Sequence, residues 1–324
     1  MGNKVTITDV AKASGYGLGT VSRVLSGDKS VKSSTREKIN KVIEELHYIP
    51  NVNGARLRRK HSGVIAVLVP IINHPFFAEF VECVEKIADQ HGCSLLLITS
   101  QMNRRKEEEI LLKIRQKEID GAIFVTHYQH DPEELKGCPL VSIDRHLSPD
   151  IPLVTSDNYG STRRALEALY KNGARRIGFL GTRPEVESEV SLRKKAYDDF
   201  VAERGLPSLA KWEVTDHGKE EELANAFFQE HGDCDAVFAS NATLAVLFHQ
   251  IARCRGIRFP EDCQLICYDG IFPIWGGEVI TCLRQDIKAM AETSFLLLQD
   301  LIEGKPTKPL NIIPTQTIVG QTTR

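Results

Sequence analysis

Residues 5–25, VTITDVAKASGYGLGTVSRVL, predict two short helices joined by a tight turn. Thr6 and Asp9 have the three-residue spacing of a capping box, which marks the start of a helix. Gly15 can adopt the positive φ at which a helix ends and the chain reverses. We therefore expect the second helix to start near Leu18.

Each of the two predicted helices has an apolar face. The inward positions are Val10 and Ala13 on the first helix and Val21, Val24 and Leu25 on the second. The opposite face of the second helix carries Thr20, Ser22 and Arg23. A short helix that exposes hydroxyls and an arginine suits the major groove of DNA. Two packed helices of an ordinary bundle are the alternative interpretation.

A third helix and a linker follow. Ser34 and Glu37 again have capping-box spacing, and Pro50 is expected to end the helix. Residues 51–62 are polar and basic, with Leu57 as an apolar exception. The helix has an amphipathic stripe that closes a three-helix core, formed by Ile39, Val42, Ile43 and Leu46.

The charge of the chain is distributed unevenly. Residues 1–60 contain 12 Lys and Arg against 5 Asp and Glu, a net charge of +7. The remaining residues contain 29 against 38, a net charge of −9. A basic head on an acidic body indicates that the head meets a polyanion. The length of 324 residues suits two or three domains.

Several classes of protein are disfavoured by composition. The N-terminal sequence has no apolar run typical of a signal peptide, and no stretch predicts a membrane span. The eight cysteines form no CxxC pair, so we expect reduced, mostly buried thiols in a cytoplasmic protein. His127, His130 and Asp131 lack a fourth metal ligand, and the glycines at 178 and 181 lack the rest of a dinucleotide fingerprint. We predict no metal and no cofactor.

From residue 63 onward the sequence predicts an α/β fold. Continuous apolar runs such as residues 63–70 are typical of buried parallel strands. Strand and helix patterns alternate over about 220 residues, which favours parallel sheets, and two sheets rather than one at this size. The predicted strands are residues 63–70, 93–100, 120–126, 139–144, 153–157, 176–181, 211–216, 235–240 and 264–269. The predicted helices include residues 76–88, 105–116, 159–171 and 289–302, before a last extended piece at 309–323.

Ligands of such folds bind beyond the carboxyl ends of the strands. Those ends combine acids, amides and arginines with the aromatic residues Phe76, Phe77, Tyr128, Phe272 and Trp275. Aromatic faces beside planar hydrogen-bonding groups suit a polyhydroxylated ligand such as a sugar. The alternative is that many of these residues are ordinary polar loop residues.

Several motifs carry a resemblance to a known family. They are DVAKASG and TVSRVLSG in residues 9–27, NHPFFAE at 73–79, DGAIF at 120–124, VSIDR at 141–145, DNYG at 157–160 and DG at 269–270. Over essentially its whole length the chain resembles the lactose-repressor (LacI/GalR-type) family of bacterial transcription regulators, and within it the sucrose-operon branch. The resemblance implies a helix-turn-helix DNA-binding domain at 1–50, a hinge helix at 51–62 and an effector-binding and dimerisation domain at 63–324. It also implies a body like that of periplasmic sugar-binding proteins, with one lobe at 63–156 plus 287–310 and the other at 157–286 plus 311–324.

The resemblance implies a regulator and not an enzyme. It predicts a repressor of a carbohydrate-utilisation operon that binds a pseudo-palindromic operator as a homodimer or larger assembly. A sugar or sugar phosphate between the lobes would modulate its affinity for DNA. A cytoplasmic sugar-handling enzyme or binding protein with an accessory DNA-binding head remains the alternative, against which the basic N-terminus and Arg23 argue.

The resemblance also assigns roles to residues. The DNA-binding positions are Thr6, Leu18, Gly19, Thr20, Ser22, Arg23, Asn51 and Leu57, with Leu57 inserted into the minor groove. The effector-binding positions that it implies are Phe76, Arg145, Arg193, Asn241 and Asp269. Phe77 and Trp275 are added as aromatic residues at strand ends that can pack on a sugar ring. We expect Arg193 to precede a helix and to emerge at the mouth of its lobe. The alternative for Arg193 and Asp269 is that they pair with each other as a structural bridge.

This chain departs from the family at some of these positions. Leu18 and Gly19 stand where bases are often contacted, and neither can form a bidentate hydrogen bond. Gly54 and Ala55 should weaken the hinge helix when it is free of DNA. Sequence specificity is therefore expected to rest on Arg23, thymine methyl contacts and DNA shape.

Overall fold

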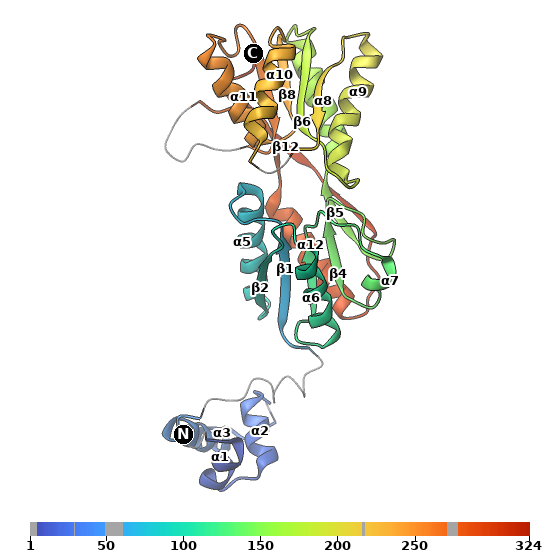
Figure 1. Cartoon of the computed structure of the whole chain (residues 1–324). Helices are drawn as coiled ribbons and strands as arrows, with labels where there is room; N and C mark the ends of the chain where they lie inside the picture. The colour runs from blue at the N-terminus through green and yellow to red at the C-terminus, as the bar shows by residue number, and fades with distance from the viewer. Residues whose placement is uncertain (1–4, 29, 49–60, 216–217, 271–277) are drawn as a thin grey trace. The chain divides into compact units, whose positions relative to one another are not determined.

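The computed structural model describes residues 5–28, 30–48, 61–215, 218–270 and 278–324 (Figure 1). The chain divides into two units, Met1–Ser62 and Gly63–Arg324. The predictions for Asn51, Leu57, Phe272 and Trp275 fall outside the described residues. No helix among the described residues is long and apolar enough to cross a membrane.

The described residues of the first unit form three helices: α1 (Ile7–Ser14), α2 (Leu18–Leu25) and α3 (Ser33–Glu45). The predicted capping box of α1 is confirmed, because the Thr6 hydroxyl accepts from the Asp9 amide and the Asp9 carboxylate accepts from the Thr6 amide at 2.9 Å. Gly15 ends α1 at a φ of 73°, as its place in the sequence predicts. The turn before α2 is therefore fixed by local sequence.

The core of the first unit consists of Val10, Val21, Val24, Ile39 and Tyr48. Ala13 was expected to point inward but is exposed, and Ala11 packs against the core in its place.

The capping box predicted for the third helix is wrong. Helix α3 begins one residue earlier, at Ser33, after an N-cap at Lys32 that makes no side-chain cap bond. The Ser33 hydroxyl instead donates to the Glu37 carboxylate at 3.1 Å. The helix ends at Glu45, before the expected proline.

The second unit contains two six-stranded sheets. The first has the strand order β11-β5-β4-β3-β1-β2, and its pairs are parallel. Its strands are β1 (Val64–Val69), β2 (Ser94–Thr99), β3 (Gly121–Phe124), β4 (Leu140–Ile143), β5 (Leu153–Ser156) and β11 (Leu310–Ile313). Its helices are α5 (Pro75–Gln90), α6 (Arg104–Arg115), α7 (Pro132–Leu135) and α12 (Ile287–Ile302).

The second sheet has the order β12-β10-β9-β8-β6-β7, with β12 antiparallel to β10. Its strands are β6 (Ile177–Thr182), β7 (Leu209–Glu213), β8 (Ala236–Ala239), β9 (Gln264–Tyr268), β10 (Thr281–Gln285) and β12 (Thr315–Ile318). Its helices are α8 (Asn158–Lys171), the 3-10 turn η1 (Glu189–Ser191), α9 (Leu192–Arg204), α10 (Glu220–His231) and α11 (Ala242–Cys254).

Each sheet is covered by helices on both faces, which explains the continuous apolar strands. On the first sheet, α5 and α12 pack on one face and α6 on the other. On the second sheet, α10 and α11 pack on one face and α8 and α9 on the other. The predicted fold of a three-helix head followed by two lobes with largely parallel sheets is confirmed.

The chain passes three times between the lobes, from β5 to α8, from β10 to α12 and from β11 to β12 (Figure 1). The last passage corrects the expected division at residue 310, since β11 belongs to the first sheet and only the chain after Ile313 returns to the second. Strand β7 lies about two residues before the predicted segment 211–216. Strand β10 was not predicted.

Candidate functional site

Helix α2 carries five of the six predicted DNA-binding residues that the structure describes, and three of the five are exposed. Leu18 is 50% exposed, and Gly19 and Arg23 are exposed as well. The Arg23 Nε donates to the Gly19 carbonyl oxygen at 3.4 Å. Val21 and Val24 point the other way, into the core, while Thr20 and Ser22 are partly exposed.

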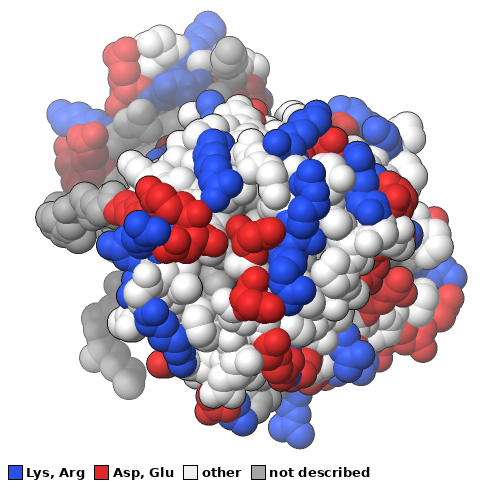
Figure 2. Space-filling view, turned by 90° about the horizontal axis from the view of Figure 1, so that it is seen from above, with Lys and Arg blue, Asp and Glu red and all other residues white. Residues whose placement is uncertain are grey.

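The face of the molecule drawn in Figure 2 carries charges of both signs. Figure 2 shows positive and negative side chains interspersed on the face it presents. Ion pairs one helical turn apart join opposite charges on the second unit, as in Lys194–Asp198 and Lys195–Asp199.

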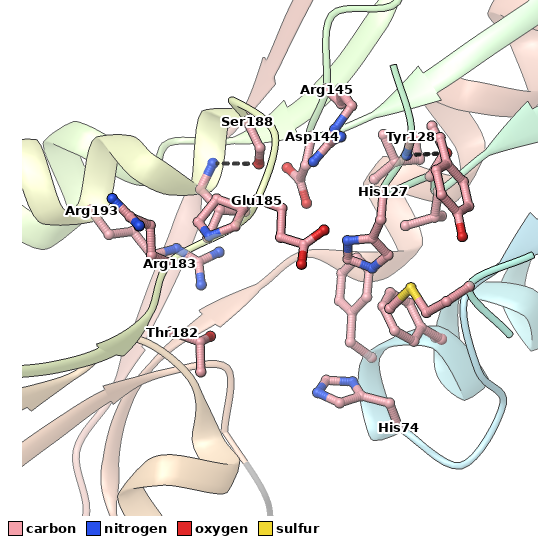
Figure 3. A pocket seen from close by; sticks show the side chains of 18 of the residues that line it. His74, His127, Tyr128, Asp144, Arg145, Thr182, Arg183, Glu185, Ser188 and Arg193 are labelled. Atoms are coloured by element: carbon pink, nitrogen blue, oxygen red, sulfur yellow. Dashed lines mark hydrogen bonds between the residues drawn. The ribbon is translucent and has the colours of Figure 1, made fainter. Parts of the chain in front are cut away.

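A cavity of about 460 Å³ lies where the strands of both sheets end. Its lining comes from the two lobes (Figure 3). The first lobe contributes His74, Phe76, Phe77, Met102, Val125, Thr126, His127, Tyr128, Ile143, Asp144 and Arg145. The second contributes Thr182, Arg183, Pro184, Glu185, Ser188, Val190, Arg193, Val214, Thr215 and Asp269, and Gln285 ends β10 where the chain leaves that lobe.

On the second-lobe wall, Arg193 is held by the protein itself. It is 3% exposed and lies in the first turn of α9, rather than before it as expected. Its Nε donates to the Asn158 side chain and its Nη1 to the Ser240 carbonyl oxygen, both at 2.7 Å. The guanidinium carbon also lies 3.5 Å from the centre of the Tyr268 ring. Arg193 thus connects three elements of its lobe while one edge lines the cavity.

Asp269 follows β9 on the same wall. Its backbone is left-handed, with a φ of 60°, which aspartate tolerates better than most residues. Its Oδ1 accepts from the Gln285 Nε2 at 2.5 Å. The Gln285 Oε1 is buried and has no hydrogen-bond partner among the described residues. Asp269 and Gln285 therefore present oxygen acceptors to the cavity.

On the first-lobe wall, Asp144 and Arg145 follow β4. Asp144 has a φ of 58°, and its carboxylate accepts from the Thr155 hydroxyl at 2.6 Å. Burial raises the pKa of Asp144, and this effect exceeds the opposing effects of the Thr155 hydrogen bond and the Arg193 charge. Arg145 is 3% exposed and its Nη2 donates to the Val186 carbonyl oxygen at 3.0 Å. Figure 3 shows these two side chains next to each other, with His127 and Glu185 nearby.

Behind this wall lies a buried acid, Glu107 on α6. Its carboxylate accepts from the Thr126 hydroxyl at 2.7 Å and contacts the His130 Nε2 at 2.5 Å. Burial lowers the pKa of His127, and the Arg145 charge lowers it further. Burial also lowers the pKa of Arg145, and the Glu107 charge opposes this lowering. Glu107 and Arg145 thus interact electrostatically across the wall.

Most of the predicted effector residues come together in this cavity. Phe76, Phe77, Arg145, Arg193 and Asp269 all line it. Asn241 does not, because its Oδ1 caps α11 by accepting from the Leu244 amide at 2.9 Å.

The sequence reasoning missed Gln285 and Glu185 as lining residues. Gln285 ends the unpredicted strand β10, so no strand-end signal pointed to it. The alternative of an Arg193–Asp269 bridge is not supported by the described contacts, since the two side chains bond to other partners.

The described residues contain no cluster of His, Cys, Asp or Glu that could hold a metal ion. The eight cysteines are free, and five of them are buried, as predicted. Burial raises the pKa of those five thiols, Cys138, Cys234, Cys263, Cys267 and Cys282.

Comparison with known proteins agrees with this architecture. Residues 6–51 match the family described as bacterial regulatory proteins, lacI family, and residues 62–277 match periplasmic binding proteins and sugar binding domain of LacI family. The chain is 31% identical to the ribose operon repressor of Halalkalibacterium halodurans over 98% of this chain and 97% of that protein. It is 29% identical to the sucrose operon repressor of Streptococcus mutans over 97% and 98% of the two chains.

Solved structures extend the similarity to three dimensions. The lac repressor dimer bound to operator and the anti-inducer ONPF has a TM-score of 0.85 at 22% identity, over 99% of both chains. A complex of the regulator CelR with cellobiose has a TM-score of 0.72 at 26% identity, over 98% of this chain and 99% of the other. From its two family matches and its full-length relatives, the chain belongs to the lacI family of bacterial regulatory proteins.

Proposed function

We propose that this DNA-binding regulator, which is not an enzyme, represses a carbohydrate-utilisation operon in the cytoplasm and responds to a sugar or sugar phosphate. The observation that carries the effector assignment is the cavity between the two sheets, which is lined by both apolar rings and oxygen acceptors. Phe76 and Phe77 offer apolar faces, and Asp269 and Gln285 offer acceptors for hydroxyl hydrogens. A sugar presents that combination of apolar ring face and hydroxyl edge.

The relatives support this class of effector and of target. Two of them are named as repressors of ribose and sucrose operons, and a structural neighbour holds cellobiose. The lac repressor neighbour is a dimer on operator DNA. We propose the same arrangement here, a homodimer on a pseudo-palindromic operator.

The proposed mechanism couples the cavity to the DNA. The effector changes the angle between the lobes and, through it, the spacing of the two hinges at residues 51–60. The hinges fold when two heads lie side by side on DNA, and Leu57 from each enters the central minor groove and bends the site. DNA affinity then changes only by the difference in effector affinity between the two lobe arrangements.

Mobility shift of DNA from upstream of the gene, with and without candidate sugars, tests the function. Arg23→Ala should lower specific binding by roughly 1–3 kcal/mol and relax discrimination at one base pair per half-site. The variant should keep wild-type effector affinity, since α2 and the cavity belong to different units. If the Arg23→Ala variant protected the operator at the same protein concentration as the wild type, the assignment of α2 as the recognition helix would be contradicted.

A second test concerns the hinge. Leu57→Ala should reduce DNA bending and operator affinity and leave effector binding intact. Circular-permutation gels measure the bend angle, and an angle equal to that of the wild type would remove Leu57 from the mechanism.

A further inference from the structure

The position of Arg145 is fixed by its backbone and by one side-chain bond. The Ser142 hydroxyl donates to the Arg145 carbonyl oxygen at 2.6 Å, directly after the left-handed Asp144. At the other end of the residue, Nη2 donates to the Val186 carbonyl oxygen at 3.0 Å. Val186 belongs to the loop after β6, so Arg145 reaches from the first lobe to the second. The guanidinium is therefore held in place at the cavity wall.

Two of its nitrogen atoms remain unused. Nε and Nη1 of Arg145 are buried and have no hydrogen-bond partner among the described residues. The residue is 3% exposed and lines the cavity. A guanidinium stays protonated in proteins, so these are two donors of a charged group withdrawn from bulk water. Such a group is costly to bury without an acceptor, and an anionic oxygen is the acceptor that fits its fork best.

The carboxylates near the cavity are mostly engaged elsewhere. Glu107 accepts from Thr126 and contacts His130 behind the wall. Asp144 accepts from Thr155 and interacts with the Arg193 charge.

Two further acids line the cavity. Asp269 accepts from Gln285, on the opposite wall. Glu185 is labelled in the same close view as His127 (Figure 3), and its charge opposes the lowering of the His127 pKa that burial causes. No described ion pair joins Arg145 to any of these carboxylates.

We propose that Arg145 binds an anionic group of the effector, which makes the effector a sugar phosphate or a sugar acid rather than a neutral sugar. This proposal rests on the proposed sugar-responsive function and specifies the chemical class of its ligand. The hydroxyl-bearing part of the ligand lies towards Asp269 and Gln285, and its anionic end lies at Nε and Nη1 of Arg145. Because Arg145 also bonds to Val186, the anion lies where first- and second-lobe segments meet.

Calorimetric titration of the full-length protein tests the proposal with matched probes. The probes are glucose, fructose and ribose, each with its terminal phosphate ester, and gluconate as a sugar acid. The wild type should bind at least one anionic member more tightly than its neutral parent. Arg145→Gln should weaken that binding by about 10- to 100-fold, the value of lost charge-assisted hydrogen bonds, and should change the affinity for the neutral parent by less than about twofold.

Arg183→Gln is the control for the same loss of charge, because Arg183 is an exposed arginine at the rim of the same cavity. This variant should retain the preference for the anionic probe. Thermal melting and operator binding without effector should confirm that both variants are folded. A preference lost in Arg183→Gln and kept in Arg145→Gln would overturn the assignment to Arg145.

Inorganic phosphate separates this proposal from the sugar assignment. Millimolar phosphate should raise the melting temperature of the wild type relative to chloride at equal ionic strength, and this rise should be absent in Arg145→Gln. If neutral sugars bound as tightly as their phosphate esters to both the wild type and Arg145→Gln, the anion proposal would be overturned and the sugar function would stand. Protection by phosphate with no binding of any sugar or ester would instead overturn the sugar function. A phosphoester preference without gluconate binding would identify the anion as phosphate.

Discussion

The two walls of the cavity each carry one buried arginine, and the two arginines use their nitrogen atoms differently. Both residues are 3% exposed. On the second-lobe wall, Nε and Nη1 of Arg193 donate to Asn158 and Ser240. On the first-lobe wall, the same two atoms of Arg145 have no partner among the described residues. Equal burial therefore does not imply an equal role.

This difference distinguishes an arginine that stabilises the fold from an arginine that can bind a ligand. A buried charge that is fully hydrogen-bonded contributes to the stability of the fold that surrounds it, and its removal leaves polar partners unsatisfied. A buried charge with open donors contributes little to stability and retains capacity for a ligand. We infer that Arg193 mainly supports its lobe and that Arg145 mainly recognises the effector.

The largest expected effect is on stability. Arg193→Met should lower the free energy of unfolding of the body by about 2–4 kcal/mol, because it leaves the Ser240 carbonyl and the Asn158 amide without their partner. Arg145→Met should change it by less than about 1 kcal/mol, since the loss of the bond to Val186 is offset by the removal of a buried charge whose donors lack acceptors. Urea denaturation of both variants measures the two values, and equal losses would remove the distinction between the walls.

A second prediction concerns the acceptors of the second-lobe wall. Asp269→Asn should keep the left-handed backbone, which asparagine also tolerates, and should leave the protein folded. It should weaken effector binding by about 1.5–3 kcal/mol, through loss of a charged acceptor for hydroxyl groups. Effector titration alongside a melting curve measures both properties. A folded variant with wild-type affinity would exclude Asp269 from the binding site.

A third prediction sharpens the charge argument on the first-lobe wall. Glu107→Gln removes the carboxylate that acts on Arg145 from behind. The affinity for an anionic probe should then rise by about 1 kcal/mol, opposite in sign to the effect of Arg145→Gln. Titration with the anionic probe measures this change. An affinity that falls in both variants would show that Glu107 positions Arg145 rather than opposing the ligand charge.

The smallest expected effect is a pH dependence. Burial and the Arg145 charge lower the pKa of His127 from 6.5 in the folded state, so unfolding takes up a proton below that pH. The corresponding stability is present above pH 6.5 and is lost as the pH falls from there towards the lowered value.

Denaturation at pH about 7.5 and about 5.5 measures this effect. His127→Gln should reduce the pH dependence by up to about 1 kcal/mol. A pH dependence unchanged in the variant would assign the titration to another group.

Local signals explain what the sequence could predict. The Thr6 capping box, Gly15 and the continuous apolar run of β1 each determine structure within a few residues of themselves, and all three were predicted correctly. Strand β10 has the sequence TCLRQ, whose polar residues hide its burial. The Thr281 amide and the Gln285 side-chain nitrogen donate to Thr322 and Asp269, which lie far away in the sequence or at another strand end.

The same reasoning applies to the site. The sequence predicted that Phe76, Arg145, Arg193 and Asp269 lie at strand ends or lobe edges, and the structure brings them to one cavity. It could not distinguish the two arginines, because the partners of Arg193 are 35 and 47 residues away in the sequence. It also could not predict that the Asn241 side-chain oxygen caps α11 by accepting a hydrogen bond from the Leu244 amide.

The most direct test of the difference between the walls is the NMR signal of each arginine Nε–H, assigned by its loss in Arg145→Gln and Arg193→Met. On saturation with an anionic sugar that the wild type binds, the Arg145 signal should move strongly, because its Nε gains an acceptor. The Arg193 signal should move little, because its Nε remains bonded to Asn158. A large shift of the Arg193 signal with an unchanged Arg145 signal would contradict the account.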